Sequence, residues 1–495
     1  MPNAAKSPAE TRGWFAPALL VALAVTTFRI ALLAANRTDL FVDEAQYWLW
    51  GQELAFGYYS KPPLIGWAIR AATEIGGSDA SFWVRIPGPL LHCVTGLLLA
   101  AIAAPRFGKQ AAIWVCATYV TLPMVAIGSL MISTDTVMVP FLVLSLLAWM
   151  RGLDVGGSHR WAILAGLSLG IGFLGKYAAV YFIICAGLSA ALLWQARPGW
   201  KPAASGFAAF LLAISPNILW NLANGLSTVE HTLDNADWVR NPGDNATLNF
   251  VGLAEFLGSQ FAVFGPILFA CLLYLAARPR RISAEQKFLL LFSLPILAIV
   301  SVQALLSQAY ANWAATAYIA GTLLVVPWLL TNRPGLLKVS MGIHLLLAVL
   351  LPVLTVFGTG LRLGADGELL LARYLGRSDM SQSILEAAKT RGVRAIVADD
   401  RDVLADLFYF NKDGPIAVYA RPVSGRAPNH YVLKHSMPSD LTEPVLFVSK
   451  QKNAPNECTE SVSLGRIAPQ NGAYAHRSQK LFLVDAQCLV ARPGN

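Results

Sequence analysis

The run from Leu337 to Gly358 reads LKVSMGIHLLLAVLLPVLTVFG and carries one charged residue, Lys338, near its start. A helix that crosses a bilayer needs about 20 mostly apolar residues, so this run predicts a transmembrane span. Similar runs recur upstream, and together with candidates in Pro63–Ile75 and the long loops they predict roughly eleven to thirteen spans by this length criterion. The other runs are Trp14–Ala35, Val84–Ala104, Gln110–Gly128, Thr134–Met150, Trp161–Gly175, Tyr177–Trp194, Ala203–Leu222, Val251–Ala276, Lys287–Ser307 and Asn312–Leu330.

The composition predicts the same class. Hydrophobic residues make up 55% of the chain and charged residues only 14%, whereas an average soluble domain is about 25% charged. We therefore expect an integral membrane protein. We also expect the first run to be retained, because no small-x-small cleavage site follows it; a removed leader is the alternative.

Positive charge is concentrated in every second loop, which is typical of the cytoplasmic loops of a membrane protein. Arg106 and Lys109 follow the second run, and Arg278, Arg280 and Arg281 follow the eighth. The pattern predicts a cytoplasmic amino terminus and an outward-facing first loop, and an odd number of spans leaves the tail outside. The net charge of +9 comes largely from these loops, so it needs no nucleic-acid partner.

The tail, residues 359–495, has more charge and no long apolar run. Alternating helix and strand patterns predict a small α/β domain of about 130 residues, enough for its own core. Ser381–Arg391 and Val403–Phe410 are expected to be helices. The expected strands are Val393–Ala398, Ile416–Tyr419, Tyr431–Lys434, Val445–Ser449 and Leu481–Val484.

Two cysteines, Cys458 and Cys488, lie in this tail, while the other four lie in apolar runs. A disulfide can persist in an exported domain, but the sequence leaves the separation of the two residues open. No CxxC or HExxH spacing indicates a zinc site.

The first outward loop begins Phe41-Val42-Asp43-Glu44-Ala45-Gln46-Tyr47-Trp48, with two adjacent carboxylates close to the bilayer. Charges held so near a membrane need a reason. Consecutive residues point to different faces of a helix or strand. One carboxylate can therefore face a cavity and act as a general base toward a hydroxyl. The other can cap a helix or form an ion pair with a basic residue. The alternative is structural: Asp43 caps a helix Glu44–Gln52.

The same loop continues as Tyr58-Tyr59-Ser60-Lys61-Pro62-Pro63. The prolines hold Lys61 extended and fix the direction of its ammonium group, which suits a phosphate. A lysine that reaches lipid headgroups is the alternative. Tyr58 and Tyr59 can hydrogen-bond a sugar or phosphate oxygen, or they serve as interfacial anchors.

Two charged residues on the outer side can join this site. Asp135, at the start of the fourth run, either caps its helix or lines the cavity of Asp43. Lys176 lies in an outward turn, where basic residues are depleted, and is a candidate second phosphate ligand.

Two outward loops supply the remaining candidates. Ala223–Phe250 has the length of a lid or binding loop; it contains His231, and Arg240, which suits a phosphate. Tyr310 and Asn312 lie at the outer end of the tenth run, where they bind substrate or belong to an aromatic belt.

Nucleotide-binding motifs are absent: the sequence has neither GxxxxGK[ST] nor GxGxxG after a strand. Outward-facing acids cannot reach a cytosolic nucleotide sugar, so a reaction here needs a donor that lies in the bilayer, such as a lipid-phosphate sugar. A polytopic transporter or flippase is the alternative, although no internal repeat of the kind common in transporters is present.

The motifs at 43–48, at 58–64 and at Asn-Trp-Ala 312–314 resemble the bacterial branch of the dolichyl-phosphate-mannose protein mannosyltransferase superfamily. That branch includes the aminoarabinose transferase of lipid A and rhizobial lipopolysaccharide galacturonosyltransferases. The resemblance implies a GT-C transmembrane domain over 1–358, with periplasmic loops 36–83 and 223–250, and a periplasmic α/β domain over 359–495. It also implies an inner-membrane enzyme that transfers sugar, with inversion, from a polyprenyl-phosphate donor to lipid A or core oligosaccharide.

The resemblance also implies residue roles. Asp43 matches the catalytic aspartate, Lys61 the lysine that binds lipid phosphate, Tyr58 a tyrosine near the donor phosphate, and Asp135 a second cavity acid. Ser60 departs from the pattern, because the aminoarabinose transferase has a glutamate there that helps to hold a metal. The departure argues against a bound divalent metal and favours a galacturonosyl or other hexosyl donor.

Overall fold

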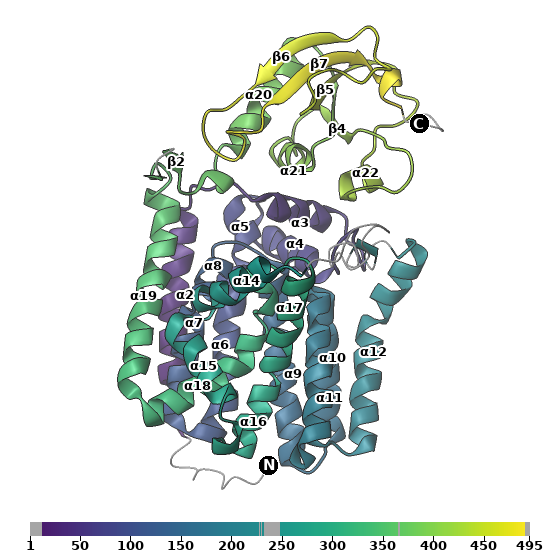
Figure 1. The fold of residues 1–495 in the computed structure, drawn as a ribbon. Coiled ribbons are helices and arrows are strands. Elements are labelled where there is room, and N and C mark those ends of the chain that lie inside the picture. The colour runs from purple at the N-terminus through teal and green to yellow at the C-terminus, as the bar shows by residue number, and fades with distance from the viewer. Residues whose placement is uncertain (1–11, 227, 229, 232–247, 365–366, 491–495) are drawn as a thin grey trace. The chain divides into compact units, whose positions relative to one another are not determined.

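The computed structural model describes residues 12–226, 228, 230–231, 248–364 and 367–490 (Figure 1). The chain forms two compact units. The helical unit comprises Met1–Ala34, Lys61–Ala68 and Arg85–Pro352, and the tail unit comprises Ala35–Ser60, Ile69–Val84 and Val353–Asn495.

Apolar helices build the helical unit, and the longer ones run side by side in Figure 1. They are α2 (Phe15–Ala34), α6 (Pro87–Phe107), α7 (Lys109–Thr121), α8 (Pro123–Gly128), α9 (Thr134–Asp154), α10 (His159–Gly175), α11 (Val180–Leu192), α12 (Trp200–Ala223), α14 (Phe250–Val263), α15 (Pro266–Ala276), α16 (Ala284–Leu291), α17 (Leu294–Leu306), α18 (Ala317–Asn332) and α19 (Pro334–Phe357), with the short 3-10 helices η1 (Tyr177–Ala179), η2 (Trp194–Ala196), η3 (Pro279–Arg281) and η4 (Ala311–Ala314). Helix α4 (Leu64–Gly76) begins in this unit and continues in the tail unit.

Proline and glycine shorten several of the expected spans. The run Gln110–Gly128 is broken before Pro123, and the run Val251–Ala276 bends by 116° between α14 and α15. There Gly265 has a φ of +93° and Pro266 begins the next helix. Within the described residues, six helices are long and apolar enough to cross a membrane, or seven with the bent pair. This count is below the eleven to thirteen expected, because broken runs and shorter helices such as α18 do not meet the length criterion.

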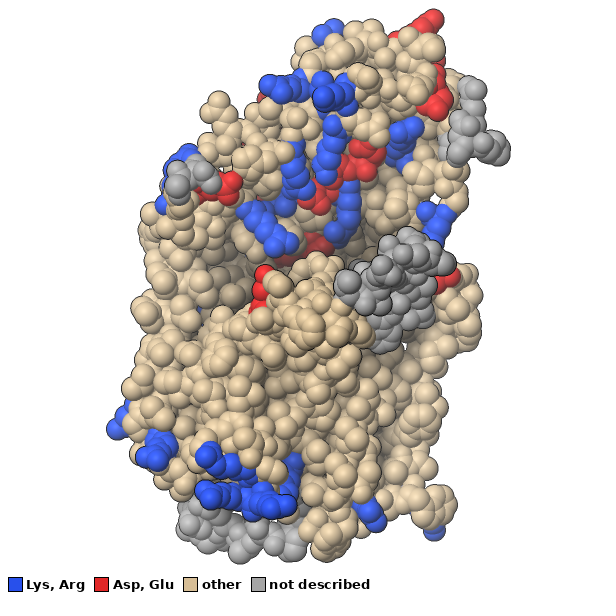
Figure 2. All heavy atoms as spheres, in the orientation of Figure 1, with Lys and Arg blue, Asp and Glu red and all other residues tan. Residues whose placement is uncertain are grey.

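The surface of the helical unit is apolar over a wide area. On the face shown in Figure 2, a broad band carries no charged side chain, and Lys and Arg gather at the lower end. Large apolar side chains are exposed along α12 and α19, including Leu212, Leu219 and Leu346. Exposed apolar surface of this extent is costly in water, so the surface is that of a multi-pass membrane protein.

The tail unit contains a five-stranded sheet of order β4-β3-β5-β7-β6. Its strands are β3 (Ala395–Ala398), β4 (Ala417–Ala420), β5 (Pro444–Ser449), β6 (Val462–Ile467) and β7 (Gln479–Asp485). Strand β3 pairs in parallel with β4 and β5, with Val397 opposite Tyr419 and Phe447, whereas β7 runs antiparallel to β5 and β6. All four residues of β3 are buried, as expected for a central parallel strand.

Helices accompany this sheet in the same unit. They are α3 (Val42–Gln52), α5 (Ser81–Arg85), α20 (Arg377–Thr390), α21 (Arg401–Phe410) and α22 (His430–Lys434), with a two-stranded ribbon of β1 (Arg362–Leu363) and β2 (Glu368–Leu369) and the 3-10 helices η5 (Ala372–Tyr374) and η6 (Ala486–Leu489). The expected α/β tail is therefore present. The expectation of a strand at Tyr431–Lys434 is wrong: Asn429 accepts a hydrogen bond from the Val432 amide and caps a helix there. Strand β6 was not expected from the sequence.

Most of the predicted periplasmic loop 36–83, namely Ala35–Ser60 and Ile69–Val84, is part of the tail unit, whereas it was expected to belong to the transmembrane domain. Trp48 donates a hydrogen bond from Nε1 to Asp79 at 2.8 Å, and Tyr409 donates from its hydroxyl to the Asp79 carbonyl at 2.7 Å. Asp39 accepts the amide of Arg377 at 2.9 Å. These contacts join three stretches of chain that are far apart in sequence, so the domain boundary is not a single point near residue 358.

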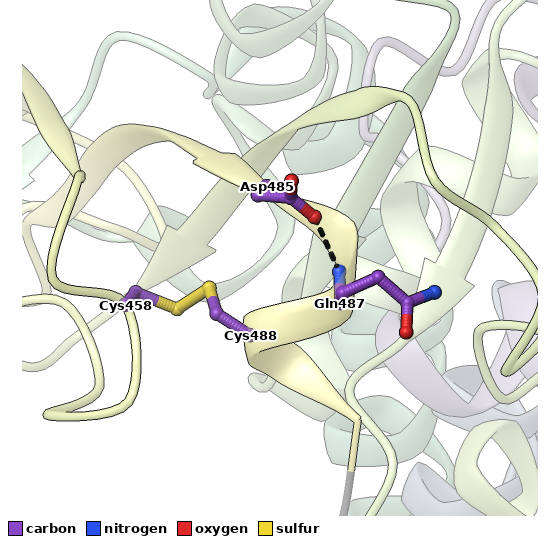
Figure 3. The surroundings of a disulfide bond; sticks show 4 residues. All are labelled: Cys458, Asp485, Gln487 and Cys488. Atoms are coloured by element: carbon purple, nitrogen blue, oxygen red, sulfur yellow. Dashed lines mark hydrogen bonds between the residues drawn. A yellow bond between two sulfur atoms is a disulfide. The ribbon is translucent and has the colours of Figure 1, made fainter.

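Cys458 and Cys488 form a disulfide with Cα atoms 5.0 Å apart (Figure 3). Cys488 lies in η6, where Asp485 accepts the amide of Gln487 at 2.8 Å and caps the turn. The bond ties the loop before β6 to the end of the sheet.

Candidate active site

Helix α3 carries the two adjacent carboxylates, and only one of them has a capping role. The helix begins at Val42, with Phe41 as its N-cap. Glu44 is 2% exposed, and its carboxylate accepts the Phe41 amide at 2.9 Å. Asp43 is therefore not the helix cap, contrary to the structural alternative considered above. With Glu44 occupied by the cap, Asp43 is the carboxylate of the pair that is available for chemistry.

Asp43 is bound by an arginine from the tail. Arg401 donates from Nη2 to Asp43 Oδ1 at 2.5 Å and from Nε to Gln46 Oε1 at 3.0 Å. Burial lowers the pKa of the Arg401 guanidinium, but the Asp43 carboxylate and its hydrogen bond outweigh that effect and raise the pKa above its usual value. The guanidinium is thus a fixed positive charge beside Asp43.

Arg401 was not predicted from the sequence as a site residue. It is the first residue of α21, whose N-cap is Asp400, and a basic residue at that position has no distinctive local pattern. Asp43 and Arg401 are 358 positions apart in sequence, so only an analysis of correlated positions across many relatives carries a signal for this contact.

Tyr58 and Tyr59 are buried and bind backbone groups. Tyr58 donates its hydroxyl to the Trp50 carbonyl at 2.6 Å, and its ring stacks on the Trp50 ring at 4.8 Å. Burial raises the pKa of Tyr58 to about 12. Tyr59 donates to the Ala427 carbonyl at 3.0 Å. Both tyrosines hold the outward loop in shape, and their expected contacts with substrate stay predictions.

Lys61 belongs to the helical unit and lies just before α4, whereas Asp43 belongs to the tail unit. The predicted meeting of these two side chains in one pocket stays a prediction.

A second cluster, in the helical unit, brings together three of the expected site residues. Lys176 donates to both carboxylate oxygens of Asp135 at 2.8 Å, and Asn312 donates from Nδ2 to Asp135 Oδ2 at 3.0 Å. The cap of α9 is Ser133, which accepts the Thr136 amide. The capping role considered for Asp135 is therefore wrong, and its carboxylate instead joins α9 to the turn after α10 and to η4.

The remaining expected residues are more scattered. Tyr310 is 60% exposed and meets the Trp313 ring edge to face at 5.6 Å. His231 is partly buried. Arg240 lies outside the described residues, so its expected phosphate contact is not described by the structure.

A buried arginine in α2 is a further residue that the sequence analysis missed. Arg29 is 2% exposed and donates to Ser129 Oγ at 3.1 Å. A single cation in an apolar run was the available signal, because an ionisable residue in a transmembrane helix indicates a functional or structural site.

In the part of the chain that the structure describes, no group of three or more His, Cys, Asp or Glu side chains is arranged to hold a metal ion.

Comparison with known proteins identifies the family of the chain. The family model of dolichyl-phosphate-mannose-protein mannosyltransferases matches residues 60–220. The lipid A galacturonosyltransferase RgtD of Rhizobium johnstonii is 37% identical over 474 residues, which cover 95% of this chain and 98% of RgtD.

Two solved structures of ArnT from Cupriavidus metallidurans identify the fold. The apo structure matches with a TM-score of 0.64 at 12% identity, over 96% of this chain and 98% of ArnT. The structure bound to undecaprenyl phosphate matches with a TM-score of 0.63 at 14% identity, over 97% of this chain and 99% of ArnT. The chain therefore belongs to the same family as RgtD, within the bacterial branch of the dolichyl-phosphate-mannose protein mannosyltransferase superfamily, and is a multi-pass membrane glycosyltransferase with the GT-C fold.

Proposed function

We propose that the enzyme transfers galacturonic acid from a polyprenyl-phosphate carrier to lipid A. The name and the 37% identity of RgtD support the sugar and the acceptor. The undecaprenyl phosphate bound to ArnT supports a polyprenyl-phosphate carrier. The serine at position 60 also favours a uronic acid or neutral hexose over aminoarabinose.

Asp43 is the proposed general base, and its geometry carries the proposal. Its hydrogen bond to Arg401 uses Oδ1, and the side chain is 44% exposed. Among the described residues, Oδ2 is therefore open to an acceptor hydroxyl. A carboxylate placed in this way contributes about 10²–10⁴ to the rate as a general base.

The reaction is a single displacement. Asp43 accepts the proton of the lipid A hydroxyl as its oxygen attacks the anomeric carbon of the donor. The new carbon–oxygen bond forms on the face opposite the phosphate, while the bond between the anomeric carbon and the phosphate oxygen breaks. The phosphate keeps the electron pair and leaves as polyprenyl phosphate, so the configuration inverts. Asp43 then returns its proton to solvent.

Lys61 is the proposed ligand of the departing phosphate. Two prolines follow it and restrain its backbone, and a preorganised charge on a leaving group is worth about 10²–10³ in rate. Lys176 already donates to both oxygens of Asp135, so we assign it to the positioning of Asp135 and Asn312. Asp135, Asn312 and Tyr310 remain proposed contacts to substrate, as does His231.

We place the enzyme in the bacterial inner membrane with a cytoplasmic amino terminus. The alternation of basic loops supports this orientation. It puts α3, the Asp135 cluster and the tail domain on the periplasmic side, where lipid A is exposed.

Mass spectrometry of lipid A tests the proposal. A strain that lacks the gene is expected to lose the mass of one uronic acid from lipid A and to regain it from a plasmid copy. Purified enzyme is expected to restore that mass when it is given polyprenyl-phosphate galacturonate. A lost hexose or aminopentose would contradict the proposed sugar, and an unchanged lipid A with a changed core oligosaccharide would contradict the proposed acceptor.

A further inference from the structure

Arg401 occupies an unusual position for a tail residue, because it lies across one face of the helix that carries the proposed base. Asp43 and Gln46 are three positions apart on α3 and therefore share a face. The Arg401 guanidinium donates to both, at 2.5 Å and 3.0 Å. Gln46 is 3% exposed, so the Nε contact is anchored in a buried group.

The Arg401 guanidinium has N–H donors beyond those that bind Asp43 and Gln46. Arginine carries five N–H groups and no acceptor. In the described part of the chain, the hydrogen bonds of Arg401 use one hydrogen on Nε and one on Nη2. Nη1 and the second hydrogen of Nη2 remain, and the side chain is 39% exposed. These donors form one edge of a planar fork, which binds a carboxylate through two parallel hydrogen bonds.

Neighbouring basic residues of the tail unit are paired with acids of their own. Arg477 donates to Asp402 at 2.6 Å, and Lys412 lies 3.5 Å from Asp79. Arg401 instead contacts the face of α3 where the proposed chemistry occurs.

We propose that Arg401 binds the carboxylate of the donor's uronic acid and makes the enzyme selective for a negatively charged sugar. The inference rests on the proposed function, since it takes the sugar to lie beside Asp43. One edge of the guanidinium holds Asp43 through Oδ1, and the other edge binds the sugar carboxylate. A residue of the tail domain thereby discriminates between a negatively charged sugar and a neutral one.

The chemistry of the fork explains both acceptance and rejection. A uronate satisfies two N–H donors with two ionised oxygens. A neutral hexose has one hydroxyl at that position and leaves a donor unpaired, which a site built for hydrogen bonding penalises. An aminopentose brings a second positive charge next to the guanidinium, and like charges repel.

The experiment compares two donors, polyprenyl-phosphate galacturonate and polyprenyl-phosphate galactose, with the purified full-length enzyme and lipid A. For Arg401→Gln we expect kcat/KM to fall about 10²-fold with galacturonate, the size expected for loss of a strong donor, and to fall by a smaller factor with galactose, because loss of the Asp43 anchor affects both donors whereas loss of the carboxylate contact affects only galacturonate. Arg401→Lys is expected to retain part of the galacturonate activity. The matched control is Arg477→Gln, which removes a similar arginine–aspartate pair of the same unit and should leave the ratio of the two donors unchanged.

A binding measurement separates substrate recognition from an effect on the base. Galacturonate 1-phosphate should inhibit the wild type more strongly than galactose 1-phosphate does, and Arg401→Gln should remove that difference. Asp43→Asn should keep it, because the asparagine leaves Arg401 in place. These inhibition constants also cover the case in which transfer from galactose is too slow to measure.

Two results would overturn the inference. An equal loss with both donors in Arg401→Gln, with no change in the two inhibition constants, would mean that Arg401 acts only through Asp43, while the proposed function stands. Equal kcat/KM values of the wild type for galactose and galacturonate would show that the enzyme does not select a sugar by its charge. If the wild type transfers neither sugar to lipid A, it is the proposed function that fails.

Discussion

Asp43 combines two properties at the scale of a single residue: a firm anchor at Oδ1 and an accessible second oxygen. Anchoring sets the direction of Oδ2, and access allows an acceptor hydroxyl to reach it. The neighbouring Glu44 shows the opposite arrangement, since it is buried and satisfied by the Phe41 amide. The fold thus separates the roles of two carboxylates that are adjacent in sequence.

The first prediction concerns the base. Asp43→Asn keeps the shape of the side chain and an oxygen for Arg401 but removes the proton acceptor. We expect transfer to fall by about 10²–10⁴, while the protein elutes and melts as the wild type does. Asp402→Asn, on the neighbouring helix α21, is the control and should retain full activity. Wild-type activity of Asp43→Asn in a lipid A transfer assay would rule out Asp43 as the base.

The second prediction concerns the leaving group. Lys61→Ala should lower kcat/KM about 10²–10³-fold, because a fixed positive charge on the departing phosphate is lost. Lys61→Arg keeps the charge and should recover part of the rate. Both variants are measured with the same polyprenyl-phosphate donor. Equal activity of the alanine and arginine variants would mean that the charge at this position does not act on the phosphate.

At the scale of helices, close backbone contact holds α10 against α12. A Cβ atom built on Gly166 would lie 1.9 Å from the carbonyl oxygen of Gly206, and one on Gly170 would lie 2.4 Å from Ala213 Cβ. Small residues allow membrane helices to approach closely, and their packing drives association in a lipid environment.

The third prediction follows from this contact. Gly166→Val should separate α10 from α12 and lower stability by about 1–3 kcal/mol or more, the usual cost of overpacking. It should appear as a lower melting temperature and lower yield in detergent. Gly187→Val on α11 is the control, because a Cβ there meets no atom within 4 Å. Equal melting temperatures for the two variants would contradict the proposed helix contact.

The fourth prediction concerns pH and helix α22. Burial lowers the pKa of His430 to about 3, and the neighbouring His435 and Lys434 add to the effect. Its ring meets the Trp50 ring edge to face at 5.7 Å. The unfolded histidine has a pKa of about 6.5, so between about pH 6.5 and pH 3 the unfolded state binds more protons than the folded state. Stability from this group is therefore lost as the pH falls through that range.

His430→Gln removes that proton uptake. The melting temperature of His430→Gln relative to the wild type should therefore rise when the pH is lowered from about 7.5 to about 5.5. A comparison of variants cancels other groups that titrate nearby, such as Asp406, whose pKa burial raises to about 7. A constant difference between the two proteins at both pH values would show that His430 does not resist protonation.

At the scale of the whole molecule, the tail unit is assembled from three stretches of chain. Helix α3 from the outward loop packs with α21 from the tail, and Tyr59 reaches the Ala427 carbonyl. The stability of the tail therefore bears on the position of Asp43.

The fifth prediction tests this dependence through the disulfide. Cys458 and Cys488 close a loop of sequence separation 30, and loss of such a bond costs about 2–4 kcal/mol in typical cases. Cys458→Ser or treatment with reductant should lower the melting temperature of the tail and reduce transferase activity at elevated temperature. Cys185→Ser is the control, because it replaces a buried free thiol of the helical unit and breaks no disulfide. Full activity and stability of Cys458→Ser would show that the bond is dispensable.

The sequence predicted the class of most elements, because the relevant information is local. Apolar runs correspond to α9, α12 and α19, and the expected tail helices correspond to α20 and α21. Two of the mispredicted elements, α22 and β6, have equally local reasons. The segment Tyr431–Lys434 has the composition of a strand, but Asn429 caps it as a helix. Strand β6 alternates too weakly, since most of its residues are exposed.

The candidate site was predicted in part. Asp43, Asp135, Lys176 and Asn312 were all expected, and the structure joins the last three into one cluster. The pairing itself was not predictable, because the residues come from α9, the turn after α10 and η4. The geometry also decided which side chains bind the amides at the start of α3 and α9. They are Glu44 and Ser133, not Asp43 and Asp135.

The sequence by itself determined that this chain is a membrane protein with an α/β tail, because hydropathy and the helix and strand patterns are properties of neighbouring residues. The glycosyltransferase class was implied by the resemblance of short motifs to a known family and is shown by the comparison with RgtD. Only the tertiary structure decided that Arg401 holds Asp43, and that the outward loop packs with the tail rather than standing alone. Contacts between residues hundreds of positions apart depend on how helices and strands pack, and the sequence near either residue carries no trace of its distant partner.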